Sequence, residues 1–223
     1  MGVDYDDITQ ALAPTGLIAR GGFVVPADET DMRTLADGRR TRCIVVVGNA
    51  GDAMWHRWED PGTDDPLDTW TRRTLHPIAD RLGATYIHPN DTPFPPLQRW
   101  ARRADDVWPS PLGILIHPDY GLWHAYRGAL LFAEPVTGLP VTGIRSSPCE
   151  TCADQPCLAT CPVDAFTADG YDHVACRAHV TSGAEPDCLH QGCAARLACP
   201  VSPMTYTADQ VHFHMRAFLG MTD

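Results

Sequence analysis

The sequence predicts an α+β protein in two parts, an α/β sandwich followed by a small cysteine-rich module. Strand-like and helix-like segments alternate before residue 135, which is typical of a layered α/β domain. Eight of the nine cysteines fall between residues 149 and 199. Residues 135–148 are rich in Pro, Gly and Ser and are predicted to connect the two parts. We therefore expect domains at 1–145 and 146–208, with a closing helix or tail at 209–223.

The first predicted strand and helix follow from apolar spacing. The run CIVVVGNAG (43–51) is a buried strand, because β-branched residues fill it and glycines end it. Cys43, inside this run, is expected to be a small core residue rather than a ligand. A helix begins at Pro66 after two aspartates, and Pro77 is expected to kink or shorten it. Its apolar positions are Leu67, Trp70, Thr74, Ile78 and Leu82.

The remaining elements are predicted in the same way. A short strand at 84–89 precedes a helix at 96–105. The run at 112–118 is a strand bounded by prolines, and 122–132 is a further strand that we expect to pair with it. A helix at 208–220 closes the chain.

Composition excludes several classes of function. The chain has 223 residues, 44% of them hydrophobic, which is enough for a core outside the cysteine-rich part. The formal net charge of −11 repels nucleic acid and anionic membranes. No apolar run approaches the roughly 18 residues needed to span a bilayer, and the N-terminal residues lack the pattern of a signal peptide. We expect a cytoplasmic protein that binds neither nucleic acid nor membrane.

The cysteines form two sets, each ending in Cys-Pro. Four thiolates can hold one 4Fe–4S cluster, so eight match two clusters. In two-cluster ferredoxins, the cysteine before the proline ligates the other cluster. The spacing departs from the usual C-x2-C-x2-C-x3-C-P run, because two extra residues separate the second and third cysteines. The first set is Cys149, Cys152, Cys157 and Cys161, and the second is Cys176, Cys188, Cys193 and Cys199.

Other interpretations of the cysteines stay open. Disulfide frameworks belong to short secreted chains, which this is not. Zinc would suit two CxxC pairs, but only Cys149 and Cys152 have that spacing, and zinc gives no reason for the repeated Cys-Pro. A single cluster with free thiols is the third alternative.

A dense stretch at 116–127 (IHPDYGLWHAYR) is the candidate ligand site of the first part. His117 follows an apolar strand and precedes a tight turn, and Tyr120, Trp123 and Tyr126 offer flat aromatic surface. Arg127 adds a fixed positive charge. The residues alone allow a second interpretation, an aromatic hairpin in the core with His117 hydrogen-bonded to the backbone.

This stretch resembles the Ile-His-Pro segment of the CblC family of cobalamin-processing proteins. The matching residues are Ile116, His117, Pro118, Gly121, Trp123, Ala125, Arg127 and Gly128. GNAGDAMWHRW (48–58) and DPLDTW (65–70) resemble the family in the same order. The resemblance covers roughly residues 10–135. It implies a nitroreductase-like fold and a large cavity in which cobalamin is bound base-off and loses its upper ligand.

The cysteine order resembles epoxyqueuosine reductase and the two-cluster halves of reductive dehalogenases, which use cobalamin. The resemblance implies that one cluster near the corrinoid is held by Cys149, Cys152, Cys157 and Cys199. It implies that the other is held by Cys161, Cys176, Cys188 and Cys193. In animal CblC proteins the corresponding region serves glutathione chemistry, so we expect electrons rather than a thiol to drive ligand removal here.

The expected function is that of a cobalamin reductase or decyanase supplied by a reductase, ferredoxin or flavodoxin. The chain has no DxHxxG motif, so a histidine lower ligand of that type is not indicated. His117 is the expected catalytic residue. Two other functions stay open: a cobalamin-dependent reductase of an organic substrate (a dehalogenase or epoxide reductase), and a plain ferredoxin. The expected cobalamin contacts are His117, Tyr120, Gly121, Trp123 and Arg127.

Several assignments keep two interpretations. Arg127 either pairs with a corrin amide or phosphate, or forms a structural ion pair. His212 and His214 either line the cavity or lie on a solvated helix face. The WHRW segment at 55–58 is either a lid or a packed helix start.

Overall fold

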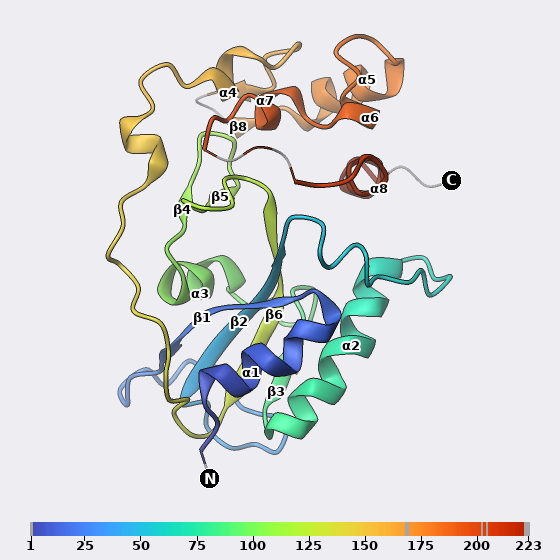
Figure 1. The fold of residues 1–223 in the computed structure, drawn as a ribbon. Helices are drawn as coiled ribbons and strands as arrows, with labels where there is room; N and C mark the ends of the chain where they lie inside the picture. The colour runs from blue at the N-terminus through green and yellow to red at the C-terminus, as the bar shows by residue number, and fades with distance from the viewer. Residues whose placement is uncertain (1, 168–169, 202, 204, 221–223) are drawn as a thin grey trace. The chain divides into compact units, whose positions relative to one another are not determined.

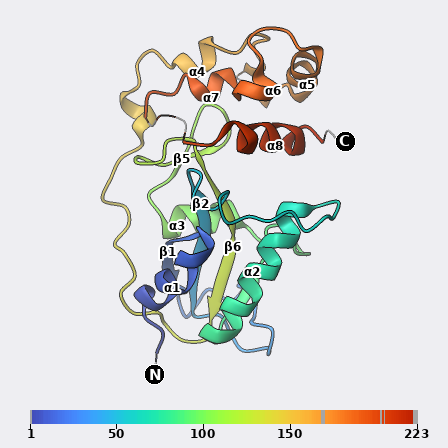
Figure 2. The same ribbon diagram turned by 45° about the vertical axis from the view of Figure 1, so that its right-hand side comes forward.

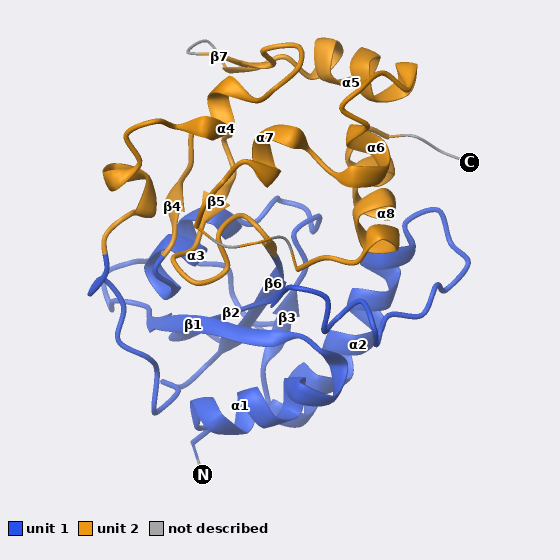
Figure 3. Ribbon diagram, turned by 45° about the horizontal axis from the view of Figure 1, so that its top comes forward, with its two compact units in different colours: residues 1–106, 125–145 blue, residues 107–124, 146–223 orange. Residues whose placement is uncertain are grey.

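A computed structural model describes residues 2–167, 170–201, 203 and 205–220 of the chain. It divides into two compact units, which are coloured separately in Figure 3. Unit 1 comprises residues 1–106 and 125–145, and unit 2 comprises 107–124 and 146–223. The segment 107–124, which carries His117, therefore belongs with the cysteine module rather than with the sheet.

Unit 1 is built on a four-stranded sheet in the order β1-β2-β6-β3 (Figure 1). The strands are β1 (Ile18–Val24), β2 (Cys43–Ala50), β6 (His124–Phe132) and β3 (Thr85–Ile87). The pairs β1–β2 and β3–β6 are antiparallel. The expected strands at 43–51, 84–89 and 122–132 are thus confirmed as elements of one sheet.

The alternation of side chains along β2 divides the core of unit 1 into two layers. Cys43, Val45 and Val47 pack with α1 (Tyr5–Leu12) and α2 (Pro66–Leu82). Ile44 and Val46 pack on the other face with α3 (Leu97–Ala104). Figure 2 shows α1 and α2 together on one side of the sheet. The predicted sandwich of helices about a sheet is confirmed, and Cys43 is fully buried in it as expected.

The second helix follows the predicted start and stop signals. Pro66 is its first residue, after Asp65 at the N-cap, and Gly83 ends it in the left-handed conformation with φ 65°. Leu75 and Ile78 are buried against the sheet. Pro77 lies inside the helix and does not shorten it.

Three elements of unit 1 were not predicted: α1, the 3-10 helix η1 (Ala13–Thr15) and β1. Helix α1 begins with a capping box, in which the Asp4 carboxylate accepts from the Asp6 amide and Asp7 bonds back to the Asp4 amide.

Strand β1 carries a register shift between Ala19 and Gly22. Gly21 adopts φ +76° there, and a Cβ at this position would collide with the Ala104 carbonyl oxygen. The glycine pair thus marks a bulge inside a strand.

The predicted pairing of 112–118 with 122–132 is wrong. Only Leu115–Ile116 of that run forms a strand, β5, and it pairs with β4 (Trp108–Pro109). The chain turns back immediately after β5, because His117 and Gly121 exchange both backbone hydrogen bonds. The C-terminal part of β6 is apolar on both faces and lies between β2 and β3.

Unit 2 is assembled from the 107–124 hairpin and short helices. These are η2 (Pro148–Thr151), α4 (Pro156–Ala159), α5 (His173–Ser182), α6 (Cys188–Gln191), α7 (Ala194–Leu197) and α8 (Ala208–Phe218), with a small hairpin of β7 (Phe166–Thr167) and β8 (Gly170–Tyr171). The C-terminal helix is confirmed. Among the described residues, no helix is both long and apolar enough to cross a membrane.

Candidate functional site

The first cysteine group surrounds a small apolar pocket in unit 2. The pocket is also lined by Ile116 and Leu122 of the 107–124 hairpin. The thiols lie close enough for their charges to interact, since Cys152, Cys157 and Cys199 each act on Cys149. The hairpin side chains and the thiols also share one apolar cluster. The four cysteines of this group are Cys149, Cys152, Cys157 and Cys199.

The second cysteine group lies around α5, α6 and the start of α7. The charges of Cys161 and Cys176 act on Cys188, and those of Cys176 and Cys188 act on Cys193. The Cys161 sulfur accepts a hydrogen bond from the Ala165 amide at 3.3 Å. The chain thus brings together the members of each set of four that the resemblance implied.

Capped turns hold several of these cysteines in place. The Ser147 hydroxyl accepts from the Cys149 amide, and Cys157 is the second residue of α4, after Pro156. Asp172 accepts from two amides at the start of α5, which carries Cys176. Cys188 opens α6, and Asp187 caps it. Backbone N–H groups at such helix starts favour an anionic thiolate.

Burial opposes ionisation of the thiols. It raises the pKa of Cys149, Cys157 and Cys188 above the ordinary value, and that of Cys193 to about 11. A thiol with such a pKa stays protonated at neutral pH. A positively charged metal centre that replaces the proton would hold it as a thiolate.

The thiols are not arranged around a single ion. Within the described part of the chain, no three His, Cys, Asp or Glu side chains are placed to hold one metal ion. Four cysteines on one zinc would each be about 2.3 Å from it and so would be close together.

His117 lies in a closed turn of the hairpin. It is 7% exposed, and its ring stacks on Tyr120 with centroids 4.4 Å apart. Its Nδ1 accepts from the Asp119 amide at 3.0 Å and the Tyr120 amide at 3.2 Å, so neutral His117 carries its proton on Nε2. The turn depends on Gly121, whose φ is +55°. These contacts match the backbone-bonded hairpin that was the alternative interpretation.

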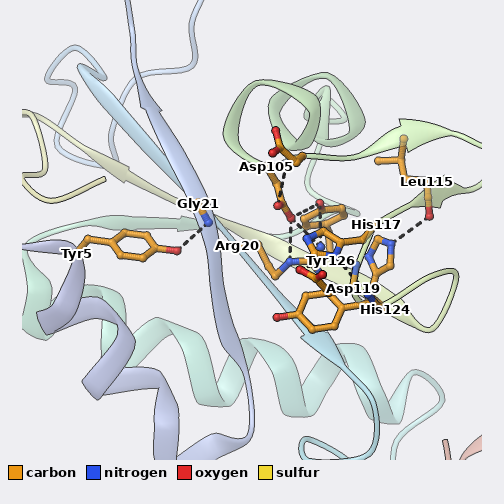
Figure 4. Close-up of polar contacts among 11 residues, drawn as sticks. Tyr5, Arg20, Gly21, Asp105, Leu115, His117, Asp119, His124 and Tyr126 are labelled. Carbon is orange, nitrogen blue, oxygen red and sulfur yellow. Dashed lines mark hydrogen bonds and ion pairs between the residues drawn. The ribbon is translucent and has the colours of Figure 1, made fainter. Parts of the chain in front are cut away.

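The next residues of the stretch are also engaged within unit 2. The His124 Nε2 lies 3.0 Å from the Leu115 carbonyl oxygen (Figure 4). Trp123 is 3% exposed and meets Tyr206 edge to face at 5.4 Å. The Arg196 guanidinium lies 4.0 Å from the centre of the Trp123 ring. Trp123 therefore packs in the core of this unit.

Arg127 lies in unit 1 and joins a polar network at one end of the sheet. Its Nε donates to the Asn49 Oδ1 at 3.0 Å, and its charge acts on Asp68. The fully buried His88 lies 3.5 Å from the same carboxylate and lowers its pKa. Arg127 is thus held by structural partners, and the His88–Asp68 pair is an addition that the sequence analysis did not predict.

A second buried network in unit 1 was also not predicted. Arg20 is 3% exposed and its Nη2 lies 2.6 Å from Asp105. The Tyr126 hydroxyl donates to the same carboxylate at 2.9 Å, as the dashed lines in Figure 4 show. Burial raises the pKa of Tyr126, which stays protonated. No periodic pattern marks partners that are 85 residues apart.

The remaining candidate residues, on α8 and in the WHRW segment, differ in burial and in their partners. His212 and His214 are half-buried on α8, and His212 stacks on His190 at 4.7 Å. In the WHRW segment, Trp55 stacks on Trp58 at 4.6 Å, and Trp58 packs against the core of unit 1. This segment is a series of turns, not a helix start.

A cavity of about 750 Å³ lies in unit 1. It is lined by residues from the segments 31–36 and 85–100, with Trp100 among them. None of the expected cobalamin contacts lines it.

Comparison with known proteins gives a likeness to a solved structure. No protein-family model matches the sequence, and no curated protein matches it. Among solved structures, the chain is similar to a Caenorhabditis elegans B12-trafficking protein CblC, a homologue of human MMACHC. The identity is 14% and the TM-score 0.49, over 94% of this chain and 89% of the other.

Proposed function

We propose that this chain is an iron–sulfur-dependent cobalamin reductase that removes or reduces the upper ligand of a bound corrinoid. The observation that carries the proposal is the arrangement of unit 2. Its eight cysteines lie in two groups of four, and the first group shares a pocket with the hairpin that bears His117. Two groups of four cysteines, each able to hold an electron-carrying cluster, beside the hairpin with His117 would suit a reductase.

The grouping supports two 4Fe–4S clusters with crossed ligation. Cys199, from the second Cys-Pro motif, lies with Cys149. Cys161, from the first motif, lies with Cys188. This exchange between motifs is the one found in two-cluster ferredoxins. It ties the two sites together, so the loss of either crossing cysteine would disturb a site made largely by the other motif.

The side chains of the hairpin have separate roles in this proposal. Ile116 and Leu122 cover the first cysteine group and exclude water from it. Neutral His117 carries its proton on Nε2, and we assign that atom to orienting the ligand that leaves the corrinoid. Tyr120 stacks on His117 and fixes the ring plane. The bound clusters would supply one-electron transfer from a reductase, ferredoxin or flavodoxin.

The remaining assignments complete the proposal. Cobalamin is the substrate, and its contacts in unit 2 are His117, Tyr120 and Gly121. The reaction takes place in the cytoplasm.

Iron content tests the cluster assignment. The anaerobically reconstituted chain should carry about eight irons, with broad visible absorption. Cys199→Ser should lose roughly half of this iron, since four of the eight ligands belong to its group. Cys43→Ser is the matched control, because Cys43 is buried in unit 1 and should leave the iron unchanged. One tightly bound zinc in place of iron would refute the assignment.

Turnover tests the reaction. With a chemical reductant, the iron-loaded chain should convert cyanocobalamin and release cyanide without any organic acceptor. His117→Gln should slow this conversion while iron content stays constant. A requirement for an organic acceptor would instead favour a cobalamin-dependent reductase of an organic substrate.

One observation favours a different function, that of an electron carrier. The His117 Nδ1 is bonded to its own turn, and Trp123 is packed beneath Arg196 and Tyr206. If cobalamin neither binds nor changes spectrum on reduction while eight irons are present, the chain is a ferredoxin.

A further inference from the structure

Arg196 is a buried arginine that lies in the sequence between a cysteine of the second group and a cysteine of the first. It lies on α7, three residues after Cys193 of the second group and three before Cys199 of the first. The residue is 9% exposed. A charge so far from water has to be compensated by the groups around it.

The Arg196 guanidinium contacts neutral groups. Its Nε donates to the Leu122 carbonyl oxygen at 3.0 Å, and its Nη2 donates to the same oxygen. The carbon of the guanidinium lies 4.0 Å from the centre of the Trp123 ring and 5.3 Å from that of Tyr206. Within the described ranges, no carboxylate forms an ion pair with it.

Arg20 shows how the chain treats another buried arginine. Arg20 is 3% exposed, and the Asp105 carboxylate lies 2.6 Å from it. Both arginines also contact an aromatic ring, Tyr126 for Arg20 and Trp123 for Arg196. The two arginines therefore differ mainly in their anion. Arg20 has a carboxylate partner, and among the described residues Arg196 has none.

Tyr206 and Cys193 are the other groups around Arg196. Tyr206 hydrogen-bonds to the guanidinium, and Cys193 borders the same cavity in unit 2 as Arg196. Bound to a cluster, Cys193 would be a thiolate and would supply the anion that the carboxylates do not. A cluster bound by four thiolates is negative, and each electron that it accepts makes it more negative. A fixed cation nearby stabilises the reduced form more than the oxidised form, and weakly screened surroundings strengthen the effect.

We propose that Arg196 is the charge partner of the cluster held by Cys161, Cys176, Cys188 and Cys193, and that it raises the reduction potential of this cluster. The inference rests on the proposed iron–sulfur function. Arg196 acts through space and touches no substrate. Its effect is to favour entry of electrons at the second cluster from a donor of modest reducing power.

Two substitutions separate charge from hydrogen bonding. R196Q keeps a donor for the Leu122 carbonyl and removes the charge, whereas R196K keeps the charge. The full iron-loaded chain is titrated anaerobically and followed by electron paramagnetic resonance. The second cluster is assigned by loss of its signal in Cys188→Ser. R196Q should lower its equilibrium constant for reduction about tenfold, which is about 59 mV for one electron. R196K should shift it less than half as far.

Arg177 provides the matched control. It is exposed on α5, next to Cys176, so water screens its charge. Arg177, like Arg196, donates to a backbone carbonyl, that of Leu219. R177Q removes a charge that is nearer in sequence to a ligand of the same cluster, and it should leave the potential almost unchanged. A shift in R177Q as large as that in R196Q would show a general charge effect and overturn the proposal.

The other outcomes are also decisive. R196Q with full iron and an unchanged potential overturns the proposal, as does R196K shifted as far as R196Q. Loss of iron from both variants shows that Arg196 is only a brace for the Leu122 carbonyl, and overturns it too. Loss of iron from R196Q alone supports the proposal, since only the charge separates the two. A wild-type chain without iron refutes the proposed function before any variants are compared.

Discussion

The two units of this chain build their interiors in different ways. In unit 1, alternate residues of β2 face two apolar layers, and helices cover both faces of the sheet. In unit 2, the helices that carry the cysteines are mostly single turns, and thiols lie among the few apolar side chains of its cores. A sheet with two covered faces is stable through burial alone, whereas short capped turns need further links. If unit 2 carries the two clusters proposed above, we expect its stability to depend on them, whereas the stability of unit 1 should not.

Removal of the proposed iron should destabilise unit 2 and leave unit 1 folded, and this is the largest effect that we expect. Oxidative destruction of the clusters with a chelator present should expose unit 2 to proteolysis, because its short helices lose the links between them. The strands of unit 1 should keep their slow amide hydrogen exchange. Mass spectrometry of exchange and of cleavage sites measures both. Equal protection of unit 2 with and without iron would contradict the dependence.

Unit 1 should instead be sensitive to its buried ion pair. Asp105→Asn leaves the Arg20 guanidinium buried without an anion, and such a loss costs about 3 kcal/mol of unfolding free energy. The exposed pair of Arg39 and Asp37 is the control, and Asp37→Asn should leave the free energy of unfolding almost unchanged, because water screens this pair. Denaturant unfolding followed at the unit 1 tryptophans gives both values. Iron content should stay the same in both variants, and its loss in Asp105→Asn would contradict the independence of the units.

The sequence predicted the parts of both units that follow a local pattern. Alternation located β2, helical spacing located α2, and Cys-Pro repeats located the thiol groups that the structure assembles. The pairing of β6 was not predictable, because strand partners are selected by the shape of the whole core rather than by adjacency.

The partners of the buried charges could not be predicted from local sequence patterns either, because they lie far apart in the sequence. Arg20 and Asp105 lie 85 residues apart, and Arg196 contacts a carbonyl 74 residues away. The segment 107–124 belongs to unit 2, where Ile116 and Leu122 line the pocket of the first cysteine group although they look like ordinary strand residues in the sequence. Their burial against thiols is a property of the folded chain.

Acid should lower the stability of unit 1 through protonation of Asp68. The hydrogen bond with His88 lowers the pKa of the Asp68 carboxyl below its ordinary value of 3.8. The unfolded chain then binds the proton more readily, so the contribution to stability is present above about pH 4 and is lost as the pH falls through the folded pKa. Asp68→Asn should flatten the acid dependence of unit 1 stability. Unfolding between pH 5 and 2 measures it, and equal slopes in both proteins would contradict the prediction.

A matched pair of helix caps gives the smallest effect and the most direct comparison of the units. The Asp4 carboxylate caps α1 in unit 1, and the Asp172 carboxylate caps α5 in unit 2, where it accepts from the amides of Val174 and Ala175. Replacing either with alanine should destabilise its helix by a similar small amount, since each removes a similar cap. Only Asp172→Ala should also speed the loss of iron to a chelator, because α5 carries Cys176. Equal iron retention in the two variants would mean that α5 is held by packing, as α1 is, and that the units differ less than their cores indicate.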